Sequence, residues 1–403
     1  MSLGSDDAAT SSQVEVQVHT SVERALARHV GEGETALTPG AAVVVEWDGE
    51  RIAQDTRGWA QTHADGRELH RPLDATTRFD LASVTKGLIT TAVLMRLIGD
   101  GRMSLTTRVG EVLEGFRGPG KAEVTVAHLL GHEAGLAPWA PVYLHAQDRD
   151  TALDWVASQP LAAPTGQAHA YSDLGFMLLG GLVEAVIGRR LDAVAEREVT
   201  APLGLQATGY RPRPPDSHTP SATDVEANRF AATSQGDVHE RRMIATRVPY
   251  PVAGDPDDFD RWREHTLVGE ANDGNAWHAF EGVAGHAGAF ATVDDLAVLA
   301  RHLLAGALGE DNALAPPPVV ARFCEPTGWD RQALGWWRDP GDARAEGRLI
   351  GHSGFTGCRV AVDPSSRCTI VLLANRQHRG DPAPDITPLW RELVAALPTR
   401  PPA

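Results

Sequence analysis

The sequence predicts an α/β fold: an antiparallel sheet flanked by helices from both ends of the chain, with a large, mostly helical region inserted into it. Strand-type segments occur near both ends, at residues 41–47 and 359–373, and each end also carries an amphipathic helical stripe. Between them, from about residue 87 to residue 273, the pattern is mostly helical. The expected regions are sheet residues 13–86 and 287–403, inserted helical residues 87–286, and a flexible N-terminus at residues 1–12.

The two terminal helices are each indicated by a start signal and an apolar stripe. Residues 20–23 (Thr-Ser-Val-Glu) fit a capping box, so the first helix is expected to begin at Thr20. Thr387 followed by Pro388 is typical of the start of the last helix, because proline fits the first helical turn. The stripes consist of Val22, Leu26 and Val30 in the first helix and Leu389, Trp390, Leu393, Val394 and Leu397 in the last. Both helices are expected to pack on one face of the sheet.

The strands are indicated by β-branched residues and turn signals. Residues 41–47 are followed by Asp48-Gly49, a strong signal for a two-residue hairpin, and a second strand is expected from about Arg51. Near the C-terminus, residues 359–362 and 368–373 are two further strands joined by a polar turn. The first hairpin therefore precedes the inserted region, and the last strands follow it.

The charge of the chain limits its partners. Its 403 residues include 37 Lys and Arg against 53 Asp and Glu, a formal net charge of -16. That charge repels nucleic-acid phosphates and anionic membrane surfaces, so we expect neither nucleic acid nor a membrane as a partner. No apolar run is long enough to cross a bilayer. The polar, acidic start lacks the basic and apolar regions of a secretory signal, which favours a cytoplasmic location.

The remaining reactive side chains indicate neither a metal nor a cofactor. Three cysteines are too few, and odd in number, for a disulfide framework, so we expect buried or half-buried free thiols at Cys324, Cys358 and Cys368. His132-Glu133 lacks a second histidine four residues after the first, so no zinc-protease motif is present and a structural role is expected for His132. His286 is a further candidate to line a cleft. No Gly-rich dinucleotide or P-loop signature occurs.

An S-x-x-K motif at Ser83 and Lys86 is the main functional signal. It precedes the apolar run 87–94, which predicts a buried helix with both residues on its first turn. Because residues three apart share a helix face, Lys86 can reach the Ser83 hydroxyl and, once neutral, take its proton. The N-terminal end of the helix also favours developing negative charge. An isolated S-x-x-K is expected by chance roughly once in a chain of this length, so the motif needs further support.

Two later motifs supply that support. Residues 171–173 (Tyr-Ser-Asp) open a second apolar run, and residues 352–354 (His-Ser-Gly) lie in a strand-like segment. With the S-x-x-K motif before them, the chain resembles the serine β-lactamase and penicillin-binding-protein superfamily over about residues 40–375. The tyrosine in the second motif is most similar to the class C-like branch, which includes β-lactamase-like esterases and D-amino-acid peptidases. The resemblance implies a β-lactamase-like fold.

The resemblance also implies roles for the site residues. Ser83 would be the nucleophile, Lys86 its base, and Tyr171 the group that relays a proton to the leaving group and later activates water. A free lysine titrates near pH ~10.4, so burial or nearby positive charge would have to lower the pKa of Lys86. The backbone N–H groups of Ser83 and Phe355 would hold the oxyanion of the tetrahedral intermediate.

By the same resemblance, Ser353 and Gly354 would contact the substrate. Two residues of the motifs depart from the β-lactamase pattern, and both departures bear on which substrate binds. His352 stands where those enzymes carry lysine, and its attraction for a substrate carboxylate should fade between about pH 5.5 and 7.5. Asp173 stands in place of asparagine and should pair with Lys86, which keeps the lysine charged. Both changes argue against an efficient β-lactamase and suit an ester or a D-amino-acid-type amide.

The sequence thus predicts a serine hydrolase that cleaves an ester or amide through an acyl-enzyme on Ser83, first of all a β-lactamase-like esterase. Two alternatives stay open: a penicillin-binding D,D-peptidase or weak class C-like β-lactamase, and a catalytically silent binding protein of the same fold. The joint presence of Ser83, Lys86 and Tyr171 counts against the silent protein, which needs none of them. The expected partner is a small ester, amide or β-lactam, and the oligomeric state is left open.

Overall fold

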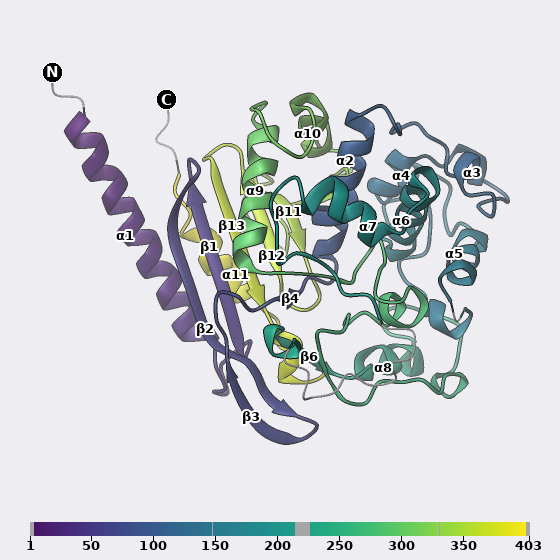
Figure 1. The fold of residues 1–403 in the computed structure, drawn as a ribbon, viewed down its shortest axis with the longest axis horizontal. Coiled ribbons are helices and arrows are strands. Elements are labelled where there is room, and N and C mark those ends of the chain that lie inside the picture. Colours follow the sequence, from purple (N-terminus) through teal and green to yellow (C-terminus); the bar gives the residue numbers. More distant parts are fainter. Residues whose placement is uncertain (1–3, 147, 214–225, 330, 400–403) are drawn as a thin grey trace.

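The computed structural model describes residues 4–146, 148–213, 226–329 and 331–399 (Figure 1). The α-helices are α1 (Gly4–His29), α2 (Ala92–Gly99), α3 (Val109–Val112), α4 (Val126–Leu130), α5 (Arg149–Ser158), α6 (Asp173–Ile187), α7 (Leu191–Ala195), α8 (Val238–Thr246), α9 (Val293–Ala307), α10 (Pro317–Cys324) and α11 (Thr387–Ala395). The strands are β1 (Gly40–Trp47), β2 (Glu50–Ala64), β3 (Arg67–Pro72), β4 (Phe79–Asp80), β5 (Gly209–Tyr210), β6 (Ala232–Gln235), β7 (Thr266–Val268), β8 (Ala289–Ala291), β9 (Gln332–Ala333), β10 (Trp336–Arg338), β11 (Ile350–Ser353), β12 (Arg359–Asp363) and β13 (Cys368–Ala374). Short 3₁₀- or π-helical segments are η1 (Lys86–Thr91), η2 (Lys121–Glu123), η3 (Val142–Leu144), η4 (Glu196–Thr200), η5 (Ala227–Arg229), η6 (Pro256–Asp258), η7 (Asn275–Ala279) and η8 (Arg376–Arg379).

The main sheet has the strand order β3-β2-β1-β13-β12-β11-β10-β9, and every neighbouring pair is antiparallel. This confirms the predicted antiparallel sheet. Ala41 on β1 lies opposite Ala374 on β13, so strands from the two ends of the chain are direct neighbours. Between β3 and β9 the chain leaves this sheet and returns to it (Figure 1).

The inserted part is helical for the most part but also contains short strands. β5 pairs with β8 in a small sheet with β4, and β6 pairs with β7. The proposed division of the chain at residues 86 and 287 stays a prediction. None of the helices in the described ranges combines the length and apolar character needed to cross a bilayer.

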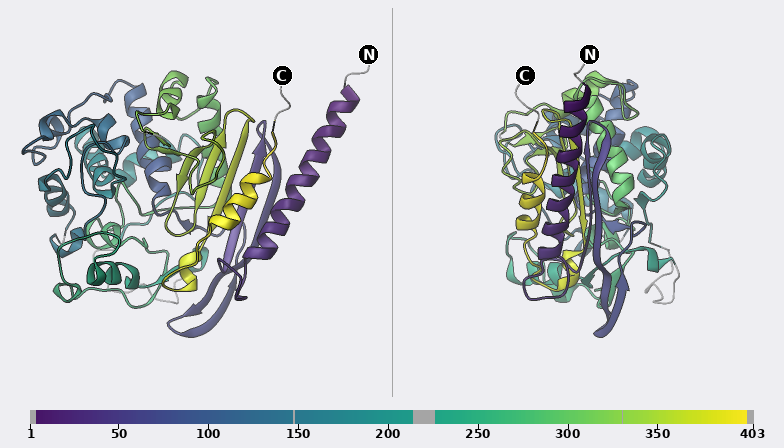
Figure 2. Two further views of the ribbon diagram at one scale, coloured as in Figure 1. Left: turned by 180° about the vertical axis from the view of Figure 1, so that it is seen from behind. Right: turned by 90° about the vertical axis from the view of Figure 1, so that its left-hand side faces the viewer.

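Helices cover both faces of the main sheet. α1 and α11 lie together on one face, as Figure 2 shows, and their stripes are buried against alternate residues of the strands such as Val43 and Leu372. The other face, which includes Ala42 and Val44 of β1, packs against α9 and the inserted helices. The terminal helices therefore share a face, as predicted.

The first hairpin has the turn that its sequence predicts. Asp48 and Gly49 both have positive φ, 50° and 86°, which is the geometry of a type I′ turn. Aspartate and glycine tolerate this left-handed region better than most residues. The turn sets β1 and β2 in register, with Trp47 opposite Glu50.

The start of the first helix was predicted wrongly. α1 begins at Gly4 rather than Thr20, well before the capping box. The flexibility expected of residues 1–12 stays a prediction. The apolar stripe continues one turn before the expected start, because Val18 is 2% exposed and packs on the sheet. Inside the helix, the Ser21 hydroxyl donates to the Gln17 carbonyl oxygen (2.8 Å) instead of capping a helix end. Extending an existing helix is easier than nucleating one, so the polar segment before Val18 continues the same helix.

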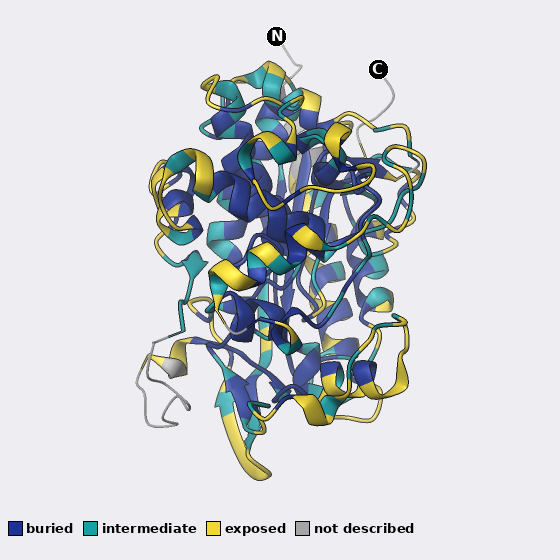
Figure 3. Ribbon diagram, turned by 90° about the vertical axis from the view of Figure 1, so that its right-hand side faces the viewer, coloured by how far each residue is buried: buried dark blue, intermediate teal, exposed yellow. Residues whose placement is uncertain are grey.

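The centre of the inserted part is α6. Every residue from Leu174 to Val183 is buried, and this all-round apolar character is typical of a helix enclosed by other elements. Figure 3 shows buried residues concentrated in the middle of the molecule and exposed ones on its outer loops. Asp173 of the second motif is the first residue of this buried helix, and Tyr171 and Ser172 come directly before it.

Candidate active site

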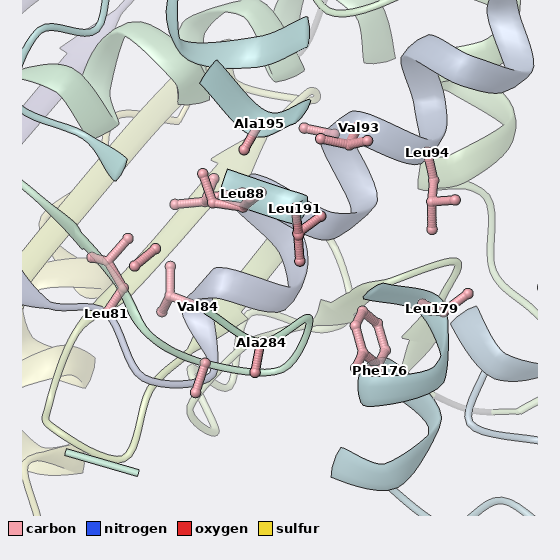
Figure 4. Close-up of a cluster of buried hydrophobic side chains, with 14 of the residues drawn as sticks. Leu81, Val84, Leu88, Val93, Leu94, Phe176, Leu179, Leu191, Ala195 and Ala284 are labelled. Carbon is pink, nitrogen blue, oxygen red and sulfur yellow. The ribbon is translucent and has the colours of Figure 1, made fainter. Parts of the chain in front are cut away.

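The Ser83 turn follows β4 and is fixed by Asp80 and by apolar packing. The Asp80 carboxylate accepts the N–H of Ala82 (2.7 Å) and of Asn272 (2.6 Å), and burial raises the pKa of Asp80 to about 6. Ala82 has a φ of 44°, a strained value for alanine that places Ser83 at a sharp bend. Val84, Leu88 and their neighbours then anchor the segment against α6 and α7 (Figure 4).

The expected helix after Ser83 is present, but its first full turns are π-helical. Ser83 itself lies in the turn just before η1, and the Lys86 N–H bonds to the Ser83 carbonyl oxygen (3.0 Å). η1 then continues into α2. π-Helical turns occur often at functional sites, and here the turn carries Lys86.

Lys86 is completely buried, and its ammonium group is surrounded by polar groups. Its Nζ donates to Ser83 Oγ (2.8 Å) and to the carbonyl oxygen of His286 (3.3 Å), and lies 2.7 Å from Asp173 Oδ1. The predicted pairing of Asp173 with Lys86 is therefore confirmed. Burial lowers the pKa of Lys86, but the attraction of Asp173 and Tyr171 outweighs it and holds that pKa above its ordinary value. The lowered pKa that a lysine base would need is therefore absent, because Asp173 keeps Lys86 charged, as the sequence predicts.

Tyr171 stands between Lys86 and an aromatic wall. The Lys86 Nζ lies 4.8 Å from the centre of its ring, and Trp337 stacks on it with ring centres 5.4 Å apart. Burial raises the pKa of Tyr171, while the Lys86 charge opposes the rise, so Tyr171 is a neutral phenol at pH 7. Ser172 caps α6 by accepting the Gly175 N–H (3.2 Å), which places Tyr171 just before the helix and Asp173 as its first residue.

The third motif brings Gly354 and Phe355 to the Ser83 turn. A Cβ on Gly354 would lie 2.4 Å from the Leu81 carbonyl oxygen, so only glycine allows this close approach. The Phe355 carbonyl oxygen is held by Arg376 Nε (2.8 Å) and Gln377 Nε2 (3.2 Å). In the described part of the chain, the N–H groups of Ser83 and Phe355 have no protein acceptor. They are thus available for an oxyanion.

His352 was expected to face the substrate, but it does not line the cleft. It is 1% exposed and lines neither cavity at Ser83, while its Nδ1 bonds to the Ser353 carbonyl oxygen (2.9 Å). Burial, with a smaller effect of the Lys86 charge, lowers the pKa of His352 to about 3. The predicted carboxylate attraction between pH 5.5 and 7.5 is therefore wrong, because burial keeps this histidine neutral across that range.

Two cavities meet at the candidate nucleophile, and both are lined by Ser83, Tyr171 and Phe355. One, of about 350 Å³, has Trp139 and Tyr250 in its wall, together with Asp173 and other acidic residues. The other, of about 460 Å³, includes Ser353, Gly354 and the arginines Arg331, Arg338, Arg359 and Arg376. The site is a cleft with one aromatic, acidic side and one side that carries these four arginines together with Asp339, Asp342 and Asp385.

Arg338 is the arginine of this cleft whose charge is least compensated. The Arg359 side chain donates to the Gly341 carbonyl oxygen (3.2 Å) and that of Arg376 to the Phe355 carbonyl oxygen, whereas the Arg338 side chain makes no hydrogen bond or ion pair within the residues described. Its sequence context, next to two tryptophans on β10, gave no signal for a binding role. Sequence reasoning therefore missed it, as it missed Trp337.

The remaining candidates from the sequence, His286 and the three cysteines, have side chains buried in the protein interior. The side chain of His286 is 1% exposed and its Nε2 lies 2.9 Å from Asp273 Oδ1, so only its carbonyl oxygen reaches the site. The three cysteines are free and buried, as predicted. Across the described ranges, no cluster of His, Cys, Asp and Glu has the arrangement of a metal site.

Comparisons with known proteins show which chains this one is similar to. The family model described as Beta-lactamase matches residues 24–395. An N-acetylmuramyl-L-alanine amidase of Bacillus subtilis (strain 168) is 32% identical over 363 residues, which is 84% of this chain and 78% of the relative. A putative D-alanyl-D-alanine carboxypeptidase of Salmonella schwarzengrund (strain CVM19633) is 30% identical over 376 residues, 87% of this chain and 82% of the relative. A penicillin-binding protein homologue from Caulobacter crescentus has a similar fold, with a TM-score of 0.66 and 21% identity over 95% of this chain and 98% of that one.

Proposed function

The chain belongs to the beta-lactamase family, a family of serine hydrolases, and on this premise we propose that Ser83 is the nucleophile of an acyl-transfer reaction. The observation that carries the proposal is the hydrogen bond from Lys86 Nζ to Ser83 Oγ (2.8 Å) at the junction of two cavities. A hydroxyl needs such a neighbouring group to lose its proton at neutral pH. Tyr171 lines the same junction and supplies a second group for proton transfer.

Acylation moves one proton from Ser83 to the leaving group. As Ser83 Oγ bonds to the substrate carbonyl carbon, its proton passes to Lys86, which gives one of its own to Asp173, 2.7 Å away. The N–H groups of Ser83 and Phe355 hold the oxyanion. When the bond to the leaving oxygen breaks, Tyr171 donates its proton to that oxygen and recovers one from Lys86, which takes its own proton back from Asp173. Water then repeats the sequence in reverse and frees Ser83.

We propose an ester as the preferred substrate. Lys86 is charged in the resting site, so it becomes a base only through Asp173, and an alkoxide leaves more readily than an amine anion. The aromatic cavity of about 350 Å³, with Trp139, Met243 and Tyr250 in its wall, suits a small apolar acyl group.

The proposed function is tested by a reagent that reacts with the nucleophile and leaves a stable adduct in place of the acyl group. A fluorophosphonate should add one equivalent of its phosphonyl group to the protein, and peptide mapping should find it on Ser83. The protein should also hydrolyse a chromogenic short-chain ester, and Ser158→Ala, at an exposed serine on α5, should label as the unchanged protein does. Labelling of another residue with Ser83 free would overturn the proposal.

Arg338 favours a second candidate substrate, a peptide with a free C-terminal carboxylate. The arginine lines the cleft that contains Ser83, and its side chain has no hydrogen-bond or ion-pair partner in the described residues, so its charge is available to an anion. The relative from Salmonella, a putative D-alanyl-D-alanine carboxypeptidase, points the same way. The sequence suggested that His352, in place of lysine, would attract a substrate carboxylate only weakly. That argument against a carboxylate substrate no longer holds, because His352 does not line the cleft.

Arg338→Gln should separate the two candidates. For a D-alanyl-D-alanine peptide the variant should raise the Michaelis constant by at least about tenfold, the value of one charge-assisted hydrogen bond. For a neutral short-chain ester it should leave the Michaelis constant within about twofold of the original. Steady-state kinetics with both substrates gives the answer. Equal changes in the Michaelis constant for both substrates would mean that Arg338 does not bind the substrate carboxylate.

A further inference from the structure

His132 follows α4 in a backbone conformation that few residues adopt. Its φ is 56°, in the left-handed region, where histidine, asparagine and aspartate are enriched among non-glycine residues. The residue is 4% exposed, lines neither cavity at Ser83, and belongs to no metal cluster in the described ranges. A buried polar side chain in a strained position calls for a specific contact.

That contact is with the segment that carries Tyr171. The His132 carbonyl oxygen accepts the Ala170 N–H (3.0 Å), and its Nδ1 accepts the Ser172 N–H (3.0 Å). One residue thus bonds to the backbone on both sides of Tyr171. Because an amide N–H can only donate, Nδ1 is unprotonated and the neutral ring carries its proton on Nε2.

The ring of His132 also packs against the phenol itself. The two ring centres are 4.5 Å apart, and Trp337 stacks on Tyr171 at 5.4 Å. Burial, followed by the nearby Lys86 charge, holds the pKa of His132 well below its ordinary value. His132 therefore stays neutral and keeps accepting the Ser172 N–H at neutral pH.

We propose that His132 is a positioning residue that fixes the Tyr171 hydroxyl for proton transfer at Ser83. The inference rests on the proposed function, in which Tyr171 relays a proton. Backbone bonds on both sides of Tyr171 and the ring contact leave the phenol little freedom to turn. A displacement of about 1 Å in a reacting group can cost about a hundredfold in rate, so a loss of this support should be visible in turnover.

Two variants of His132 separate the acceptor from the bulk of the ring. His132→Leu removes the acceptor of the Ser172 N–H and should lower kcat by at least about tenfold, with the Michaelis constant within about twofold. His132→Asn keeps an acceptor near the position of Nδ1 and tolerates a positive φ, so it should retain kcat within about threefold. Thermal unfolding identifies the temperature range in which each variant is folded. If the asparagine variant is as slow as the leucine variant, the acceptor has no part in catalysis and the proposal is overturned.

A double-mutant cycle with Tyr171→Phe gives the decisive result. If His132 acts through the Tyr171 hydroxyl, His132→Leu should lower kcat by less than about twofold in the Tyr171→Phe background. A merely structural role would give the same fold-loss in both backgrounds, and that result would overturn the inference. The single variant Tyr171→Phe reports on the proposed function by itself. Near-normal turnover there would overturn the relay role of Tyr171, and this inference with it.

Discussion

Ser83→Ala should abolish ester hydrolysis while the protein stays folded. Without the hydroxyl no acyl-enzyme forms, and loss of a serine nucleophile lowers kcat by roughly 10⁴-fold or more. Ser83 is half-buried, and its hydroxyl bonds to the Lys86 and Tyr171 side chains, so alanine removes these bonds but adds no bulk to the packing around it. The measurement is initial rate with a chromogenic short-chain ester, together with the circular dichroism melting curve.

The control for this variant is Ser158→Ala, which removes an exposed hydroxyl that bonds to the Trp155 carbonyl oxygen (2.7 Å) on α5. It should hydrolyse the ester at the original rate. Turnover by Ser83→Ala close to that of the unchanged protein, with an unchanged melting curve, would exclude an acyl-enzyme on Ser83.

Lys86→Met should lower kcat by at least about 10²-fold, the lower end of what a general base supplies. Methionine approximates the length of the lysine chain but neither takes the Ser83 proton nor pairs with Asp173. Lys121→Met is the matched control, because Lys121 is a second buried lysine, 2% exposed, whose Nζ donates to the Ala157 carbonyl oxygen (2.6 Å) away from the cleft. It should change the melting temperature and leave kcat within about twofold. If both variants lose turnover equally, the loss reflects a buried lysine rather than catalysis.

Asp173→Asn tests the charge balance at the same lysine. Asp173 is the main influence that raises the pKa of Lys86, and burial acts against it. With the carboxylate removed, burial dominates and the pKa of Lys86 falls. In the proposed acylation Lys86 gives a proton to Asp173, so in the variant only a lysine that has lost a proton to solvent can act. The kcat of the variant should therefore fall at neutral pH and recover as the pH rises. A variant with the kcat and pH profile of the unchanged protein would show that Asp173 does not take the Lys86 proton.

The sequence by itself determined the features whose signals are local. Asp48-Gly49 specified its hairpin turn because two adjacent residues must adopt positive φ. The spacing of Ser83 and Lys86 specified their contact because three residues span one helical turn. The strands near both ends and the apolar stripe of the last helix were predictable from periodicity. It was also predictable that α11 and α1 pack on the same face of the sheet. For α1 itself the signal misled, since a good capping box lies inside the helix.

Only the tertiary structure decided which side chains are buried and charged at the site. His352 was expected to lose its charge between pH 5.5 and 7.5, yet burial keeps it neutral throughout. The pairing of Lys86 with Asp173 was expected, but only the folded chain shows that this attraction outweighs complete burial. Arg338 lines the cleft and His132 bonds to the backbone beside Tyr171, and both belong to segments outside the three motifs. Desolvation and the distance between charges depend on residues that meet only in the folded chain, so no pattern along the sequence contains them.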